Sequence, residues 1–396
     1  MSRLRIIVGG MVGQFPLGGV AWDYFHYVLG LAELGHDVYY HERNDGWPFH
    51  PGKRYATDDP AYTIQFIADF FQRYAPHLAD RWHYVLLRQK HFGMTAEAFD
   101  RVAETADLFL NVSGASFIPE KLSPKCVKVF LDTDPGFNQI VLSEKFAWAK
   151  DVEQWCNLVA AHDRHLTYAE NIHGADCVIP RLGFDWRPTR CVVSLPQWEH
   201  IRQSPPPHNA AFTTVMTWDY FRGRLTFNGV EFFTKVAEFE KFDCLPHRSG
   251  FPLILAIGGV LAPLERLRAQ GWRIIDAHSA TLTPHEYQQF IGDSGAEWSV
   301  AKNIYVATRS GWFSCRTACY LAAGRPAVVQ DTAWSKFIPA GRGLLAFNTL
   351  DEAIEGLKAV ADDPLPHRAA AYEIARNYLA ADKVLPPMLD TIFSRS

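Results

Sequence analysis

One short run of the sequence combines side chains that suit an anion: Ser314-Cys315-Arg316-Thr317. The planar guanidinium of Arg316 matches the geometry of a phosphate, and the hydroxyls of Ser314 and Thr317 add hydrogen-bond donors. If a helix begins here, its unpaired amides and the positive end of its dipole also attract negative charge. The run predicts binding of a diphosphate, such as that of a nucleotide sugar. The alternative is an ordinary strand-to-helix turn capped by Ser314, with Arg316 in solvent.

The residues around this run predict the elements that would position it. Residues 299–306 are rich in β-branched side chains and predict a buried strand. Residues 315–323 predict a helix that Gly324 ends, and residues 327–330 predict a second buried strand. A strand–helix–strand unit of this kind places Ser314 at the carboxyl edge of a parallel sheet, where ligands of α/β proteins collect.

Four further residues are expected near the same edge. Lys302 and Arg309 flank the predicted strand at 299–306 and are candidates to join Arg316 around the phosphates. A solvated Lys302 at the strand edge is an equally weighted alternative. Thr217 ends the first predicted strand of the second half, and Thr332 follows the strand at 327–330. Removal of the Arg316 side chain is expected to weaken diphosphate binding and to leave the fold intact.

The N-terminus predicts another strand–helix–strand unit, with a strand at residues 4–8, a helix at 20–34 and a strand at 37–41. The loop between the first strand and the helix contains Gly10, Gly13, Gly18 and Gly19. Glycines in such a loop let the backbone pass close to a ligand or to another segment. Their spacing is too wide for a G-x-G-x-x-G fingerprint, so a nicotinamide-dependent enzyme is the weakest hypothesis.

Two carboxylates, Asp132 and Asp134, follow the strand predicted at residues 128–131. At the carboxyl end of a parallel strand they would raise one another's pKa, and one of them would act as a base toward an acceptor hydroxyl. The alternative is a polar turn that leads into Pro135 and Gly136 and takes no part in chemistry.

Residues 309–314 and the run Leu321-Ala322-Ala323-Gly324-Arg325-Pro326 resemble the donor-binding segment of glycosyltransferases with the GT-B fold, of the family 1 and family 4 type. Gly18-Gly19-Val20-Ala21 is similar to the loop that opens their first domain. Two positions depart from the pattern, since Gly311 and Cys319 stand where many retaining members carry two glutamates.

The resemblance implies transfer of a sugar from a nucleotide-diphosphate sugar to a hydroxyl acceptor that the sequence leaves unidentified, with no metal ion or other cofactor. It implies that the donor-binding residues are Ser314, Arg316, Thr317, Lys302, Arg309, Gly311, Thr332 and Thr217, and that Asp134 or Asp132 acts as the base. A nucleotide-sugar 2-epimerase of the same fold and a non-catalytic sugar-binding protein remain alternatives. The first would form product from the nucleotide sugar alone, and the second would bind it without turnover.

Length and composition are consistent with two α/β domains. The resemblance implies two Rossmann-like domains facing a cleft, with residues 1–203 as acceptor domain, 204–375 as donor domain and 376–396 as a helix that returns to the first domain. The 396 residues carry a net charge of −4, which argues against nucleic-acid binding. Seven cysteines without a C-x-x-C pair predict reduced thiols, and no apolar run approaches the roughly 20 residues of a membrane span. We therefore expect a cytoplasmic protein.

Overall fold

The N-terminal half is built on an eight-stranded sheet with the order β10-β9-β8-β7-β1-β2-β5-β6. The computed structural model describes residues 2–144, 152–218, 225–259 and 261–394. In this sheet all neighbouring strands run parallel except β5 and β6. The strands are β1 (Arg5–Gly9), β2 (Asp37–Asn44), β5 (Trp82–Leu86), β6 (Lys90–Gly93), β7 (Leu108–Val112), β8 (Val127–Asp132), β9 (Arg164–Thr167) and β10 (Trp186–Pro188). The direction of chain progression reverses between β1 and β7, which is where ligands of such sheets bind.

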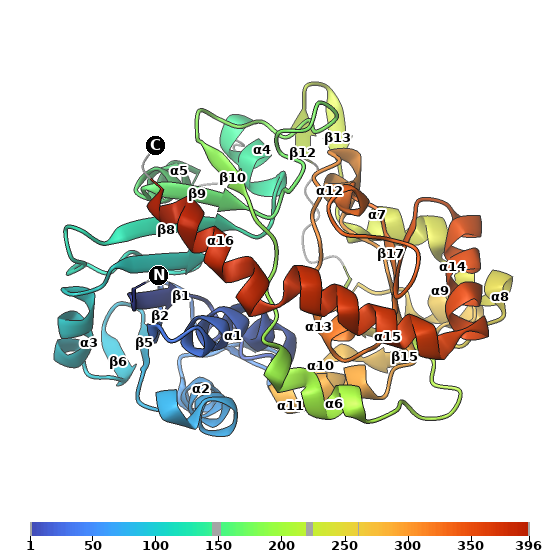
Figure 1. The fold of residues 1–396 in the computed structure, drawn as a ribbon, viewed down its shortest axis with the longest axis horizontal. Helices are drawn as coiled ribbons and strands as arrows, with labels where there is room; N and C mark the ends of the chain where they lie inside the picture. The colour runs from blue at the N-terminus through green and yellow to red at the C-terminus, as the bar shows by residue number, and fades with distance from the viewer. Residues whose placement is uncertain (1, 145–151, 219–224, 260, 395–396) are drawn as a thin grey trace.

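Helices flank this sheet (Figure 1). They are α1 (Gly18–Glu33), α2 (Ala61–Tyr74), α3 (Ala96–Ala103), α4 (Phe137–Glu144), α5 (Val152–Ala160) and α6 (Glu199–Gln203), with short 3₁₀ turns at Pro76–Leu78 and Leu195–Trp198. A small hairpin of β3 (Phe49–His50) and β4 (Tyr55–Ala56) follows β2. The central helix α1 is buried along most of its length, because its apolar and aromatic residues contact both the sheet and the second half.

The C-terminal half repeats this plan with a six-stranded parallel sheet of order β15-β14-β11-β16-β17-β18. Its strands are β11 (Phe212–Thr217), β14 (Leu253–Gly258), β15 (Arg273–Asp276), β16 (Ala296–Ser299), β17 (Ala327–Gln330) and β18 (Leu344–Phe347). A separate hairpin consists of β12 (Leu225–Phe227) and β13 (Val230–Phe232). The order is that of a doubly wound dinucleotide-type sheet, and its reversal lies between β11 and β16.

The helices of this half begin where local sequence signals place them. Thr283 and Thr349 each form a capping box with the glutamate three residues on, at the start of α11 and α14. The helices are α7 (Lys235–Phe239), α8 (Leu245–Ser249), α9 (Leu264–Ala269), α10 (Ala277–Ala280), α11 (Pro284–Gly292), α12 (Asn303–Ala307), α13 (Cys315–Ala322), α14 (Leu350–Asp362), α15 (Pro364–Ile374) and α16 (Ala381–Phe393). Short turns lie at Glu240–Phe242, Trp334–Lys336 and Ala375–Leu379.

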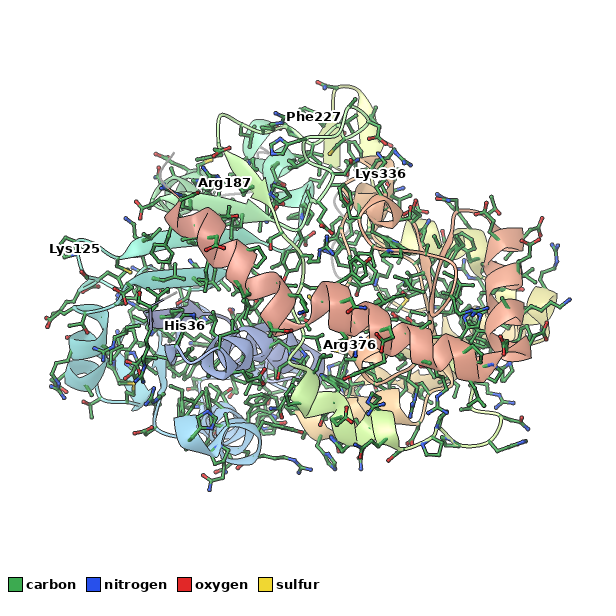
Figure 2. All side chains as sticks on the ribbon, viewed as in Figure 1. His36, Lys125, Arg187, Phe227, Lys336 and Arg376 are labelled. Atoms are coloured by element: carbon green, nitrogen blue, oxygen red, sulfur yellow. The ribbon has the colours of Figure 1, made fainter. Side chains whose placement is uncertain are left out.

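Helix α16 returns from the second half to the first, and both chain ends lie on the N-terminal half (Figure 1). Gly30 of α1 lets α16 approach closely, since an added Cβ would lie 2.6 Å from the Cβ of Ala381. Arg187, labelled near the end of α16 in Figure 2, donates a hydrogen bond to the carbonyl of Thr391 over 2.9 Å. One cluster of buried apolar residues runs from β1 through α1 to α13 and α16. The two halves therefore share part of their core.

The strand predicted at 299–306 is wrong. β16 ends at Ser299, and α12 begins at Asn303. Ile304 has the β-branched chemistry of a strand, but it packs on the helix against the neighbouring half, so tertiary contacts override its local preference. Residues 177–180 are irregular, and the amide of Val178 donates to the carbonyl of Thr308. Among the described helices, none combines the length and the apolar character needed to cross a membrane.

Candidate functional site

A pocket lies at the carboxyl ends of β16 and β17, at the start of α13, as the sequence predicts for this segment. Ser314, Arg316, Thr317 and Thr332 are among its lining residues. Ser314 is the residue before α13, yet its side chain makes no capping hydrogen bond. The hydroxyl of Thr317 is buried and has no hydrogen-bond partner among the described residues. The first amides of an eight-residue helix and two unused hydroxyls therefore face one pocket, which favours an anion.

Arg316 is neither a solvated surface residue nor a wholly free cation. Its Nε lies 2.7 Å from Oε1 of Glu297, a fully buried residue of β16, and its Nη1 donates to the carbonyl of Val215 over 2.8 Å. Burial lowers the pKa of Arg316, but the charge and hydrogen bond of Glu297, together with the nearby Tyr287 and Tyr320, outweigh that effect, and the net shift is upward. No described residue accepts a hydrogen bond from Nη2, so this nitrogen is available to the pocket that Arg316 lines.

Another basic side chain near Arg316, that of Lys235, was missed by the sequence analysis. It is the first residue of α7, is partly exposed, and has no hydrogen-bond or ion-pair partner among the described residues. Burial, followed by repulsion from Arg316 and Lys302, depresses the pKa of Lys235 well below its ordinary value. An amine whose charge is disfavoured by two neighbouring cations gains a favourable partner when a phosphate binds beside it. No motif in the sequence marks this lysine.

A carboxylate from the other half, Asp23 of α1, faces the same place and was also missed. Its side chain is exposed to solvent but has protein packed densely around it, and it accepts a hydrogen bond from the Cys315 thiol. Burial by the surrounding protein raises the pKa of Asp23 to about 7, although the Cys315 hydrogen bond and the Arg316 charge oppose this shift. A carboxylate with a pKa near neutrality, next to an anion site, has the properties of a general base.

The two aspartates predicted as catalytic residues have other contacts. Asp132 is fully buried and accepts hydrogen bonds from Asn138, Gln139 and Thr167 over 2.7–2.8 Å. Burial raises the pKa of Asp132 to about 6, but these contacts leave its oxygens no room for a substrate. Asp134 reaches across to the second half, where it binds Lys302 and the hydroxyl of Tyr305. Lys302, expected at the phosphates, is therefore partly neutralised.

Of four more predicted donor residues, three make contacts within the protein around the loop that precedes α13. Arg309 pairs with Asp176 of the N-terminal half over 2.6 Å, and Lys336, labelled in Figure 2, reaches the same carboxylate over 2.7 Å. Gly311 has a φ of 78°, and an added Cβ would lie 2.7 Å from the amide nitrogen of Asn171. Thr332 donates to the carbonyl of Trp312 over 2.6 Å. Thr217, at the end of β11, has an exposed side chain.

The glycines of the first loop serve the protein's own packing. The amide of Gly18 donates to the carbonyls of Thr281 and Leu282, and a Cβ here would lie 2.3 Å from the carbonyl oxygen of Thr283. Gly19 faces Tyr287, which also belongs to the C-terminal half. Gly10 and Gly13 pack on tyrosines of the first sheet, and the Gly13 amide donates to the buried carboxylate of Glu42 over 2.5 Å. The loop is therefore held against the second half by backbone contacts.

Within the described part of the chain, no group of three or more His, Cys, Asp or Glu side chains is arranged to hold a metal ion. The polar side chains that line the pocket are one guanidinium, one amide and several hydroxyls, which suit an anion rather than a cation.

Two facing Rossmann-like halves joined by a returning C-terminal helix define the GT-B fold, and the chain has this fold. No protein-family model matches the chain, and no curated protein matches its sequence. Solved structures match over its whole length. An α-glucosyltransferase in complex with UDP and a 13-mer DNA has a TM-score of 0.58 and 11% identity, with 100% of both chains covered.

Two other neighbours give the same picture. HepE of Anabaena in complex with UDP and glucose has a TM-score of 0.54 and 11% identity, with 99% of this chain and 100% of that chain covered. AviGT4, a glycosyltransferase involved in avilamycin A biosynthesis, has a TM-score of 0.53 and 14% identity, with 98% and 97% covered. These likenesses bear out the fold that the sequence resemblance implies.

Proposed function

We propose that the protein transfers a sugar from a nucleotide-diphosphate sugar to a hydroxyl acceptor without a metal ion or other cofactor. The observation that carries the proposal is the unpaired Lys235 near Arg316 at the start of α13, together with the carboxylate of Asp23, which is hydrogen-bonded to Cys315 at the first position of that helix. Several neighbours of the same fold are described as glycosyltransferases, two of them in complex with UDP, and this agrees with a nucleotide-sugar donor.

The positive groups would stabilise the departing diphosphate. Arg316 and the start of α13 line the pocket, and Lys235 lies close enough to Arg316 to repel it. Negative charge that develops on the leaving oxygen would be neutralised there. The hydroxyls of Ser314 and Thr317 would donate to the phosphate oxygens. These groups replace the metal ion that other transferases use for the same purpose.

Asp23 would act as the base. The acceptor hydroxyl loses its proton to the Asp23 carboxylate while its oxygen forms a bond to the anomeric carbon. The bond between that carbon and the diphosphate oxygen breaks, and its electron pair leaves with the diphosphate. One displacement of this kind inverts the configuration at the anomeric carbon. A pKa of Asp23 near 7 suits a base that works at neutral pH.

Lys235→Met tests the donor site. We expect UDP affinity to fall by about 1.5–3 kcal/mol, because one charge-assisted contact is lost. The wild-type protein should also take up protons when UDP binds in mildly alkaline buffer, since the negative charge of the diphosphate raises the depressed pKa of Lys235. Titration calorimetry in two buffers of different ionisation enthalpy measures both quantities.

Lys358→Met is the matched control, because Lys358 is an exposed lysine of α14 in the same half. It should bind UDP with the wild-type affinity and proton uptake. Unchanged affinity and uptake in Lys235→Met would show that the diphosphate does not bind at this lysine and would remove the main support for the proposal.

A further inference from the structure

A second pocket of about 210 Å³ lies in the N-terminal half. Its walls come from the end of β2, from the loop after β7 and from α5, and they include Arg43, Ala115, Phe117, Trp155 and Leu158. The loop after β7 stands beside the reversal point between β1 and β7, the position at which open parallel sheets bind ligands. No residue of the proposed donor site lines this pocket.

The lining is almost entirely apolar and includes two aromatic side chains. Trp155 is partly exposed, and its ring packs edge-on against Phe130 at 5.6 Å, which fixes its orientation. Phe117 is held from one side by the guanidinium of Arg88, 4.4 Å from the ring centre. Rigid aromatic walls around a small volume favour a flat, apolar ligand over a hydrated sugar.

Polar groups at the rim are few. Nε of Arg43 is buried and has no hydrogen-bond partner among the described residues, although Nη2 of the same side chain binds Glu120 over 2.9 Å. A ligand with one oxygen acceptor would satisfy this donor while its ring occupies the apolar space.

Hydrogen bonds link the loop beside this pocket to α1 and to the loop before α13. Gly114, which lines it, follows Ser113, whose hydroxyl binds that of Thr133 over 2.6 Å and also that of Tyr24. Tyr24 is the residue after Asp23. The carbonyl of Thr133 accepts a hydrogen bond from the indole of Trp312, on the loop that leads into α13. A ligand here would therefore lie at the same sheet edge as the transfer site.

We infer that this pocket binds the acceptor, and that the acceptor is an aromatic or similarly flat apolar molecule with a hydroxyl group. That the bound molecule is the acceptor rests on the proposed function, but the binding of such a molecule is independent of catalysis. The pocket size corresponds to one or two fused rings, since sites for larger small molecules occupy about 300–1,000 Å³.

The test uses 7-hydroxycoumarin as probe and Ala115→Trp as the variant that fills the pocket. Titration calorimetry should detect binding of the probe to the wild-type protein, and glucose should not compete with it. Ala115→Trp should weaken probe binding about tenfold or more, because the new side chain occupies the ring site. Ala160→Trp, at an exposed position on the same α5 whose residues form one wall, is the control and should bind the probe normally.

Leu158→Asn guards against a folding defect in Ala115→Trp, since it keeps the size of the side chain and makes the wall polar. It should also weaken probe binding, by about fivefold to tenfold. UDP affinity, measured on the same samples, separates the two proposals. Normal UDP binding with no probe binding, or with probe binding that neither variant changes, overturns this inference alone. Probe binding without UDP binding would instead contradict the proposed function.

Discussion

Asp23→Asn is expected to lower the rate of sugar transfer by about 10²–10⁴-fold, the usual contribution of a general base. The substitution keeps the size and shape of the side chain and removes its ability to take a proton. UDP affinity should change little, because the phosphate contacts are proposed to come from Lys235, Arg316 and the start of α13. Transfer to 7-hydroxycoumarin or another hydroxyl acceptor and UDP binding, measured on the same preparation, separate the two effects.

The pH dependence of the rate identifies the base more sharply. Burial raises the pKa of Asp23 to about 7, and a base acts in its deprotonated form. The wild-type rate should therefore rise with pH through about 7 and then level off, and Asp23→Asn should lack this rise. Asp134→Asn is the matched comparison, because the sequence marks Asp134 as the base. A pH limb that persists in Asp23→Asn and disappears in Asp134→Asn would assign the proton transfer to Asp134 instead.

The same shift has a consequence for stability. The folded-state pKa of Asp23 is higher than the ordinary aspartate value, so the folded protein holds this proton more tightly than the unfolded chain. Stability from this group is present below the ordinary aspartate pKa and is lost as pH rises toward about 7. Above that pH the protein retains a charged carboxylate that opposes folding, as expected of a residue kept for chemistry.

Local signals in the sequence correctly predicted two of the three elements around the proposed donor site. Gly324 and Pro326 after an apolar run place the end of α13 correctly, and the four apolar-rich residues of β17 match the predicted strand. The strand prediction for residues 299–306 was wrong, because a buried residue such as Ile304 is equally compatible with a strand and with a short helix that packs against the other half. Periodicity over so few residues does not distinguish the two.

The site itself depends on contacts that no local pattern contains. Asp23 and Cys315 are almost 300 positions apart in the sequence, and they meet only because α1 of one half faces α13 of the other. Lys235 follows a hairpin outside any motif. The sequence around Asp134 suggests a catalytic residue, but its carboxylate binds Lys302 of the other half. Residue type predicts which groups are able to react, whereas the packing of the two sheets decides which of them meet.

Arg316→Met is expected to lower the free energy of unfolding by about 3–5 kcal/mol, the cost of breaking a buried ion pair on one side. From the sequence, removal of the Arg316 side chain was expected to leave the fold intact. In the structure, however, Glu297 is fully buried and would lose its only ion-pair partner among the described residues. Its Oε2 already lacks a hydrogen bond. Urea denaturation of the wild-type and variant proteins measures the change.

Two further variants separate the buried charge from the loss of an arginine. Arg309→Met removes an ion pair in which both side chains are more than one third exposed, so it should cost less than about 1 kcal/mol. Arg316→Met combined with Glu297→Met removes both charges and should recover most of the lost stability, because no uncompensated carboxylate remains in the core. Equal losses in Arg316→Met and Arg309→Met would contradict the buried pair as the cause. Since the double variant is expected to be folded, its UDP affinity reports what Nη2 of Arg316 contributes to the diphosphate site without a folding defect in the measurement.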